Sequence, residues 1–186
     1  MHVGLTQRVL THNNVSYDSL SLNWYEYLEG HNLTIVPNRL NQDLVQLAND
    51  IDLLIITGGN NHPVRDIIET TLVDHLYKLG KPIIGVCHGF QMLTEYFGGT
   101  LESTNRHYNT THNVVYGNKH VSVNSYHTNK IRKLPEGAIP LAYDLDNNCE
   151  SWIKGNIGGV MWHPERESWL PKEIKDLLND NNKKEV

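Results

Sequence analysis

The sequence predicts an α/β fold in which helices cover a doubly wound, mainly parallel sheet. Two apolar runs, residues 51–57 and 82–86, have the length and the β-branched content of strands that are buried on both faces. A segment with apolar residues at helical spacing, 64–79, lies between them. Strands and helices that alternate in this way build a parallel sheet, because each helix carries the chain back across one face of the sheet.

Four further elements come before these two runs. The apolar spacing predicts a strand, a helix, a strand and a weaker helix at residues 3–6, 18–28, 33–36 and 41–48. Asp18 is a suitable first-turn acid for the first helix, and Gly30 ends it. Pro37 closes the second strand, since a proline lacks the N–H that a strand would donate. The first half of the chain therefore alternates strand and helix throughout.

The second half has a different character, with many Asn, Thr and His residues. The predicted strands are residues 113–116, 120–123, 138–143, 150–153 and 157–162. The first two surround a Gly117-Asn118 turn and predict an antiparallel hairpin, and a turn at 146–148 joins the next two. A final helix is expected at 171–178, with a polar, frayed tail at 179–186. No repeat or linker is evident, so residues 1–186 are predicted to form one domain with a small antiparallel portion.

Composition limits the classes of partner and compartment. The chain has 186 residues, 16 Lys and Arg residues that are scattered along it, and a formal net charge of −5. No basic patch predicts nucleic-acid binding, and no apolar run has the length of a membrane span. The two cysteines do not form a disulfide framework, and the first residues do not resemble a secretion signal. We therefore expect a cytoplasmic protein that binds neither nucleic acid nor membrane.

Cys87 lies where a predicted strand becomes a predicted helix. The strand ends at Val86, and Phe90 and Leu93 begin a helical pattern. Gly85 and Gly89 flank the cysteine, as a tight strand-to-helix turn requires when the chains must approach closely. The helix dipole and the free N–H groups of the first turn favour a thiolate and can also receive an oxyanion. This pattern predicts a nucleophilic cysteine.

Most cysteines in apolar runs are inert, buried side chains, and this alternative applies to Cys149. It lies between Asn148 and Glu150 with neither flanking glycines nor a helix start. We therefore interpret Cys149 as structural.

His163-Pro164-Glu165 follows the last predicted strand directly. A cysteine hydrolase needs an imidazole that exchanges the thiol proton and a third group that fixes the imidazole tautomer. His163 fits the first role and Glu165 the second, while Pro164 restricts the backbone between them. Cys87, His163 and Glu165 are therefore the predicted catalytic residues.

A glycine pair and an arginine also lie at the carboxyl ends of predicted strands, where ligands bind in open α/β sheets. Gly58 and Gly59 follow the strand at 51–57 and can bring backbone N–H groups close to a ligand. Arg8 follows the first strand and can contact an anionic substrate group, although an ordinary surface arginine is an equally good interpretation.

The 11 histidines raise the question of a metal site. Four of them come close together in the sequence: His107, His112, His120 and His127. No Cys or carboxylate joins them at ligand spacing, so we predict no metal and interpret them as hydrogen-bonding loop residues.

Together these motifs resemble the class I glutamine amidotransferase family. The resemblance rests on Gly85-x-Cys87-x-Gly89-x-Gln91, on the Gly58-Gly59 loop and on His163-Pro164-Glu165, and it covers nearly the whole chain. It implies a flavodoxin-like fold, no cofactor, and a γ-glutamyl thioester on Cys87. It also implies an oxyanion hole formed by the backbone N–H groups of Gly59 and His88. Gln91 and the backbone of Ser125 and Tyr126 would form the pocket for the glutamyl group. Asn124-Ser125-x-His127 matches a stretch that these proteins carry before their final strands.

The chain also departs from the members that are linked to synthetases. Its oxyanion loop is Gly-Gly-Asn-Asn where those members have glycine and proline, and no synthetase domain is fused to it. It is more similar to the freestanding γ-glutamyl hydrolases, which include the γ-glutamyl-γ-aminobutyrate enzymes. The opening Gly4-Leu5-Thr6-Gln7-Arg8 and the Asn23-Trp24 pair resemble a branch found with surface-polysaccharide genes.

This branch implies that the small-molecule substrate is a γ-glutamyl nucleotide amidate, the γ-glutamyl-CDP-amidate of capsular phosphoramidate biosynthesis. Loop position makes four residues candidates for contacts to the phosphorylated leaving group: Arg8, Asn60, Arg106 and His107. A γ-glutamyl-γ-aminobutyrate hydrolase is one alternative. A glutaminase subunit that supplies ammonia to a separate synthetase is another and is less favoured. A binding module without activity is the third, and a homodimer stays open.

Overall fold

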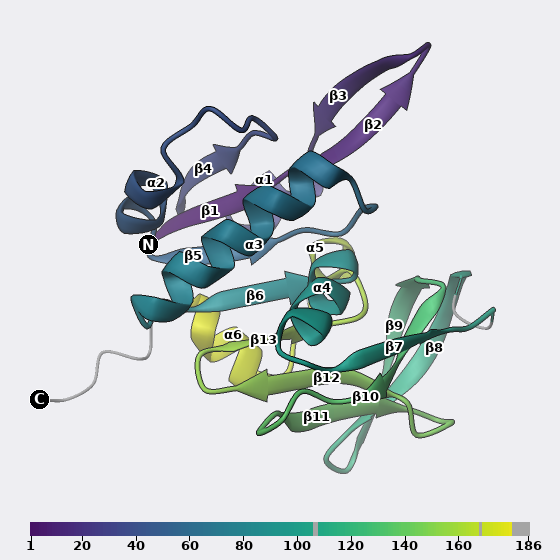
Figure 1. Ribbon diagram of the computed structural model, residues 1–186. Coiled ribbons are helices and arrows are strands. Elements are labelled where there is room, and N and C mark those ends of the chain that lie inside the picture. Colours follow the sequence, from purple (N-terminus) through teal and green to yellow (C-terminus); the bar gives the residue numbers. More distant parts are fainter. Residues whose placement is uncertain (106–107, 168, 180–186) are drawn as a thin grey trace, which may run out of the picture.

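The described residues form a nine-stranded sheet with helices on both faces (Figure 1). The structure is a computed structural model that describes residues 1–105, 108–167 and 169–179. Across the sheet the strands are β4 (Asn32–Val36), β1 (His2–Thr6), β5 (Leu53–Ile56), β6 (Ile83–Val86), β13 (Ile157–Val160), β12 (Cys149–Lys154), β11 (Ile139–Asp144), β8 (Tyr108–Tyr116) and β9 (Lys119–Tyr126). The pairs from β4 to β13 are parallel, and those from β13 to β9 are antiparallel.

The parallel half has the strand order of a flavodoxin-like fold. Numbered along the chain, its five strands run 2-1-3-4-5 across the sheet. The predicted doubly wound α/β fold with a small antiparallel portion is thereby confirmed, including the hairpin that joins β8 to β9 through Gly117. The carboxyl ends of β1, β5, β6 and β13 meet at one edge, so the segments that follow these strands lie close together in space.

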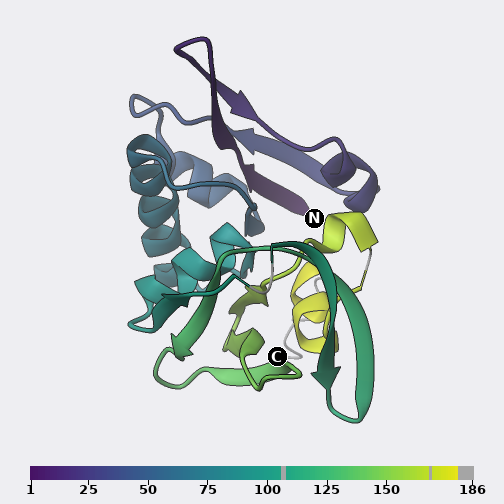
Figure 2. The same cartoon turned by 90° about the vertical axis from the view of Figure 1, so that its right-hand side faces the viewer.

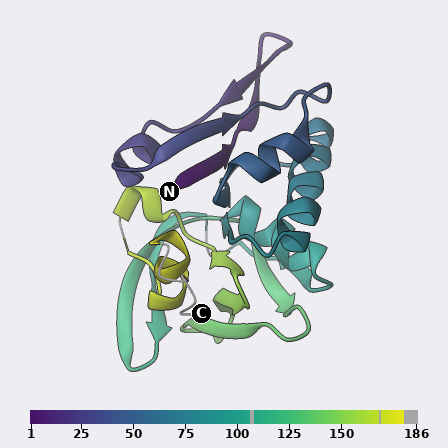
Figure 3. The ribbon, with the colours of Figure 1, turned by 90° about the vertical axis from the view of Figure 1, so that its left-hand side faces the viewer.

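Helices cover the two faces in separate groups, as the two turned views show (Figures 2 and 3). One face packs against α2 (Leu44–Asp50), α3 (Pro63–Lys78) and α4 (His88–Tyr96), and the other against α1 (Asn23–Tyr27) and α6 (Lys172–Leu178). In β5 the side chains of Leu54 and Ile56 lie in the first core, while those of Leu53 and Ile55 lie in the second. This alternation explains why β5 is apolar at every position.

The helix predicted at 18–28 is wrong over its first half. A hairpin of β2 (Arg8–His12) and β3 (Val15–Ser19) stands out from the body there, and Asp18 pairs with Val9 within it (Figure 1). The helix that remains is the five-residue α1. Leu22, directly before α1, is 77% exposed, whereas Trp24 within it is 2% exposed. The missed signal was Asn13-Asn14, whose φ angles of 49° and 61° make the tight turn that asparagine tolerates.

A second pair of strands was also missed. β7 (Thr100–Ser103) pairs antiparallel with β10 (Asn129–Lys133) and lies beside α4. Except for Asn179, the tail expected to fray lies outside the described residues. None of the helices in the described ranges is both long and apolar enough to cross a membrane.

Candidate active site

Cys87 occupies a strained turn between β6 and α4. Its φ and ψ are 50° and −104°, a conformation that residues other than glycine rarely adopt. Two backbone hydrogen bonds hold it there: its N–H donates to the Val160 carbonyl at 2.9 Å, and its carbonyl accepts from the Gln91 N–H at 3.0 Å. The side chain is therefore fixed at the sheet edge, next to the first turn of α4.

The glycines around Cys87 are required by close backbone contacts. A Cβ on Gly85 would lie 2.6 Å from the Phe90 nitrogen, and one on Gly89 would lie 2.1 Å from the Ile56 carbonyl oxygen. Neither distance leaves room for a methyl group, because the opposing atoms are backbone. These contacts press α4 onto β5 and β6, which accounts for the sequence pattern on both sides of Cys87.

His163 and Glu165 follow β13, the strand adjacent to β6. Nδ1 of His163 lies 2.8 Å from Oε1 of Glu165, and both residues are buried. A carboxylate only accepts hydrogen bonds, so Nδ1 donates and Nε2 is left for Cys87. Burial lowers the pKa of His163, but the hydrogen bonds and charges of Cys87 and Glu165 outweigh burial and raise this pKa to about 9. The three residues are thus close enough to act as one unit.

Three residues that were not predicted to contact His163 surround it: Asn124, Tyr126 and Arg166. The side-chain amide of Asn124 makes two hydrogen bonds with the backbone of His163: it donates to the carbonyl and accepts from the N–H, each at 2.9 Å. The Tyr126 ring meets the His163 ring edge-on, and Arg166 lies 4.4 Å from the centre of the same tyrosine ring. The conspicuous Asn124-Ser125-x-His127 stretch was the available signal for the clamp by Asn124.

Gly58 and Gly59 have different steric reasons to be glycine. A Cβ on Gly58 would lie 2.4 Å from Cε1 of His163, so the imidazole packs directly on the backbone of Gly58. Gly59 has a φ of +154°, and a Cβ there would lie 2.3 Å from Nη1 of Arg65. The loop therefore lies between the predicted base on one side and a buried arginine on the other.

A pocket of about 210 Å³ opens at Cys87. It is lined by Gly59, Asn60, Asn61, Cys87, His88, Gln91, Tyr126, His127, Thr128 and Asn129. Gln91 is held inside it, since its Oε1 accepts from Asn129 Nδ2 at 3.0 Å and its Nε2 lies 3.5 Å from the Met161 sulfur. The predicted oxyanion and glutamyl-binding residues line this pocket, apart from Ser125. Asn129 was not predicted.

Ser125 is fully buried in β9, where it pairs with Thr110 of β8. The prediction concerned its backbone alone, and β9 carries that backbone past His163.

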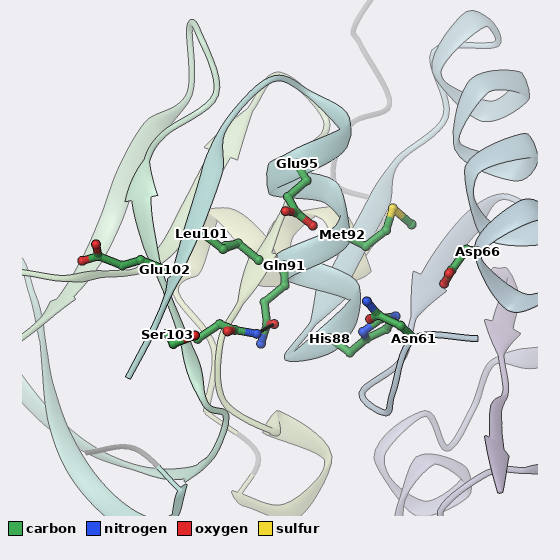
Figure 4. A pocket seen from close by; sticks show the side chains of 10 residues that line it. Asn61, Asp66, His88, Gln91, Met92, Glu95, Leu101, Glu102 and Ser103 are labelled. Atoms are coloured by element: carbon green, nitrogen blue, oxygen red, sulfur yellow. Dashed lines mark hydrogen bonds between the residues drawn. The ribbon is translucent and has the colours of Figure 1, made fainter. Parts of the chain in front are cut away.

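A second hollow, of about 360 Å³, adjoins the first along α4 (Figure 4). The two share Asn61, His88, Gln91 and Asn129. In Figure 4, Gln91, Met92 and Glu95 line the α4 side, and Leu101 to Ser103 of β7 lie across from them. Together the two hollows leave space for a substrate that is larger than a glutamyl group.

The four residues predicted to contact the leaving group have different outcomes. Asn60 lines the Cys87 pocket. Arg8 instead lines a small cavity of about 10 Å³ behind the loop, together with His163 and Glu165. Arg106 and His107 lie outside the described residues.

Two of the four histidines discussed above, His112 and His127, lie against a buried carboxylate. His112 and His120 belong to strands β8 and β9, so the prediction that they are loop residues is wrong. Glu150 Oε2 lies 3.6 Å from Nε2 of His112 and 3.5 Å from Nε2 of His127. Burial raises the pKa of Glu150, but the two histidines outweigh burial and lower it. Within the described ranges, no three His, Cys, Asp or Glu side chains are arranged to hold a metal ion. Cys149 is buried, which raises its pKa to about 12 and makes it a poor nucleophile.

Comparisons with known proteins agree with this fold. The family model for glutamine amidotransferase class-I matches residues 15–174. The γ-glutamyl-CDP-amidate hydrolase of Campylobacter jejuni is 29% identical over 91% of this chain and 92% of its own. Anthranilate synthase component 2 of Archaeoglobus fulgidus is 26% identical over 80% of this chain and 84% of its own. The crystal structure of a glutamine amidotransferase from Thermotoga maritima has a TM-score of 0.69 and 14% identity, with 97% of this chain and 85% of that chain covered.

The close contact between Gly58 and His163 predicts that a side chain at position 58 lowers activity. In Gly58→Ala, the new methyl group displaces the imidazole, so turnover should fall at least about 100-fold, as expected when a catalytic group moves by an ångström. Gly4→Ala is the matched control, because its Cβ would lie 2.7 Å from the end of the Ile51 side chain, remote from the site. It should cost stability but keep more than half of the activity. Steady-state kinetics and thermal melts of both variants check this, and an active Gly58→Ala enzyme would contradict it.

Proposed function

The chain belongs to the glutamine amidotransferase class-I family, and we propose that it is a hydrolase that cleaves a γ-glutamyl amide through a thioester on Cys87. The observation that carries the proposal is the geometry of Cys87, His163 and Glu165. A strained turn holds the thiol beside an imidazole, and a buried carboxylate orients that imidazole.

The proposed reaction begins from an ion pair. A pKa of about 9 keeps His163 protonated at neutral pH. In the proposal this ring has taken the proton of the Cys87 thiol, and the sulfur attacks as the thiolate. The thiolate attacks the γ-carbonyl carbon, and the carbonyl oxygen takes the negative charge. In the proposal, the backbone N–H groups of Gly59 and His88 stabilise this oxyanion.

Collapse of the tetrahedral intermediate breaks the C–N bond. His163 gives its proton to the departing nitrogen, and the γ-glutamyl group stays on Cys87 as a thioester. A water molecule then loses a proton to His163 and attacks the thioester carbonyl, which releases glutamate and restores the ion pair. Glu165 stabilises the imidazolium whenever it forms, through the 2.8 Å hydrogen bond.

We propose a γ-glutamyl nucleotide amidate, γ-glutamyl-CDP-amidate, as the substrate, in capsular phosphoramidate biosynthesis. Similarity to the Campylobacter jejuni hydrolase along nearly the full length of both chains supports this substrate. The 210 Å³ pocket at Cys87 and the 360 Å³ hollow beside it together leave more space than a glutamyl group fills. Asp66, Glu95 and Glu102 line the larger hollow, so in this proposal the phosphates face the Tyr126 and Arg166 side of the Cys87 pocket instead.

The second candidate function is a glutaminase that supplies ammonia to a separate synthetase. It is favoured by the similarity to anthranilate synthase component 2. The oxyanion loop, in which Asn60 and Asn61 follow the two glycines, argues for the hydrolase without a synthetase. The substrate distinguishes the two candidates.

A panel of γ-glutamyl amides tests the proposed substrate. Glutamate release from γ-glutamyl-CDP-amidate should show a higher kcat/KM than release from glutamine or from γ-glutamyl-γ-aminobutyrate, as followed by mass spectrometry. Cys87→Ala should release no glutamate from any of them, while Cys149→Ala keeps the wild-type rate. Preference for glutamine, with a rate that rises when a synthetase is added, would establish the second candidate instead.

The pH dependence tests the role of His163. Its pKa is raised, so the protonated ring that the leaving nitrogen needs is present below about pH 9 and is lost as the pH rises through that value. We expect kcat/KM to fall on the alkaline side with an apparent pKa near 9. Glu165→Gln removes one of the charges that raise this pKa, so the alkaline limb should move to lower pH. If the alkaline limb of the Glu165→Gln profile stays at the same pH or moves to higher pH, the proposed role of His163 is contradicted.

A further inference from the structure

A buried ionic network lies directly beneath the loop that carries Gly58 and Gly59. Arg65, in the first turn of α3, is fully buried, and so is Glu69 one turn later. Nε of Arg65 donates to Oε1 of Glu69 at 2.7 Å. Ionising groups that are removed from water in this way are costly unless their hydrogen bonds are satisfied, so the other contacts of the guanidinium are informative.

Those contacts go to the two ends of the loop. Nη2 of Arg65 donates to the Thr57 carbonyl at 2.6 Å, and Nη1 donates to the Asn60 carbonyl at 3.4 Å. The two carbonyls flank the peptide between Gly58 and Gly59. That peptide carries the Gly59 N–H, the predicted oxyanion donor, and anchoring the carbonyls on both sides of it restricts how the peptide can turn. The guanidinium thus fixes the orientation of the loop from below.

Steric contact reinforces this arrangement. Nη1 of Arg65 would lie 2.3 Å from a Cβ on Gly59, so the guanidinium lies against the Gly59 backbone itself. The planar fork of an arginine can reach two carbonyls at once, which a lysine ammonium on a flexible stem cannot do with the same geometry.

The network also reaches the second half of the predicted oxyanion hole. Oε2 of Glu69 lies 3.8 Å from Nε2 of His88, the residue whose backbone N–H begins α4. Burial, together with the nearby Arg65, lowers the pKa of His88 to about 3, so its ring is neutral at physiological pH. Arg65 and Glu69 therefore lie between the loop after β5 and the first residue after Cys87.

We propose that Arg65 and Glu69 are positioning residues for the oxyanion hole: Arg65 fixes the backbone of the loop at 57–60, and Glu69 holds Arg65. Neither side chain lines the Cys87 pocket, so both act through the backbone. The inference deepens the proposed function and rests on its thioester chemistry. It assigns the buried arginine on α3 to transition-state stabilisation rather than to substrate binding.

The test compares two reactions of Cys87. Acylation by p-nitrophenyl acetate passes through a tetrahedral oxyanion, whereas alkylation by iodoacetamide forms none and reports only thiolate reactivity and access. Arg65→Lys keeps the charge but loses the fork. We expect acylation to fall about 10- to 100-fold, approaching the loss of one oxyanion donor. Alkylation should change less than about 3-fold, because it makes no demand on this loop.

Two other variants keep the test decisive. Glu69→Gln retains an oxygen that accepts from Arg65 Nε, and it should lower the ratio of acylation to alkylation in the same direction by a smaller factor. If Arg65→Lys does not fold, the ratio of acylation to alkylation in Glu69→Gln tests the proposal instead, and an unchanged ratio overturns it. Val73→Ala, on the buried face of α3, is the control for general destabilisation and should melt at a lower temperature with an unchanged ratio.

An unchanged ratio in folded Arg65→Lys, or acylation and alkylation that fall together, would overturn the inference. Thermal melts establish which variants are folded. Failure of the wild-type protein to release glutamate from any γ-glutamyl amide would instead overturn the proposed function. The ratio would remain measurable in that case, so the two failures are distinguishable.

Discussion

The close approach of α4 to β5 and β6 is the constraint on which the site depends. Gly85 and Gly89 permit it, and the backbone turns so sharply that Cys87 takes a positive φ. That turn places the thiol at the carboxyl edge of the sheet, beside the first N–H groups of a nine-residue helix. A Cβ on either glycine would push α4 away, and Cys87 would move with it.

Most of the fold followed from the sequence because buried strands and long helices have strong periodicity. The runs that became β5 and β6 are apolar at every position since both faces of the sheet are covered. The β2–β3 hairpin was missed for the opposite reason. It stands out from the core, so Leu10 and Tyr17 are each about half exposed and no buried stripe marks them. Its turn depends on two asparagines, a weaker signal than glycine.

The candidate site likewise contains residues that the sequence predicts and residues that it does not. The sequence already brings Cys87, His163 and Glu165 together, because these residues follow strands that it predicts well and the ends of neighbouring parallel strands meet in space. Asn124 and Asn129 were not found, since their roles are hydrogen bonds to His163 and Gln91 across long sequence separations. Arg65 gives no sequence signal at all: it is a charged residue on a helix, and only burial beneath Gly59 makes it distinctive.

The central claim is that a γ-glutamyl group is carried on Cys87 during turnover. The direct measurement is acid quenching within one turnover on γ-glutamyl-CDP-amidate or the best γ-glutamyl amide, followed by peptide mapping by mass spectrometry. Cys149 is an internal control, because its burial raises its pKa to about 12. The account predicts a glutamyl adduct on the peptide that contains Cys87 and none on the peptide that contains Cys149. Glutamate release without an adduct on Cys87 would contradict it.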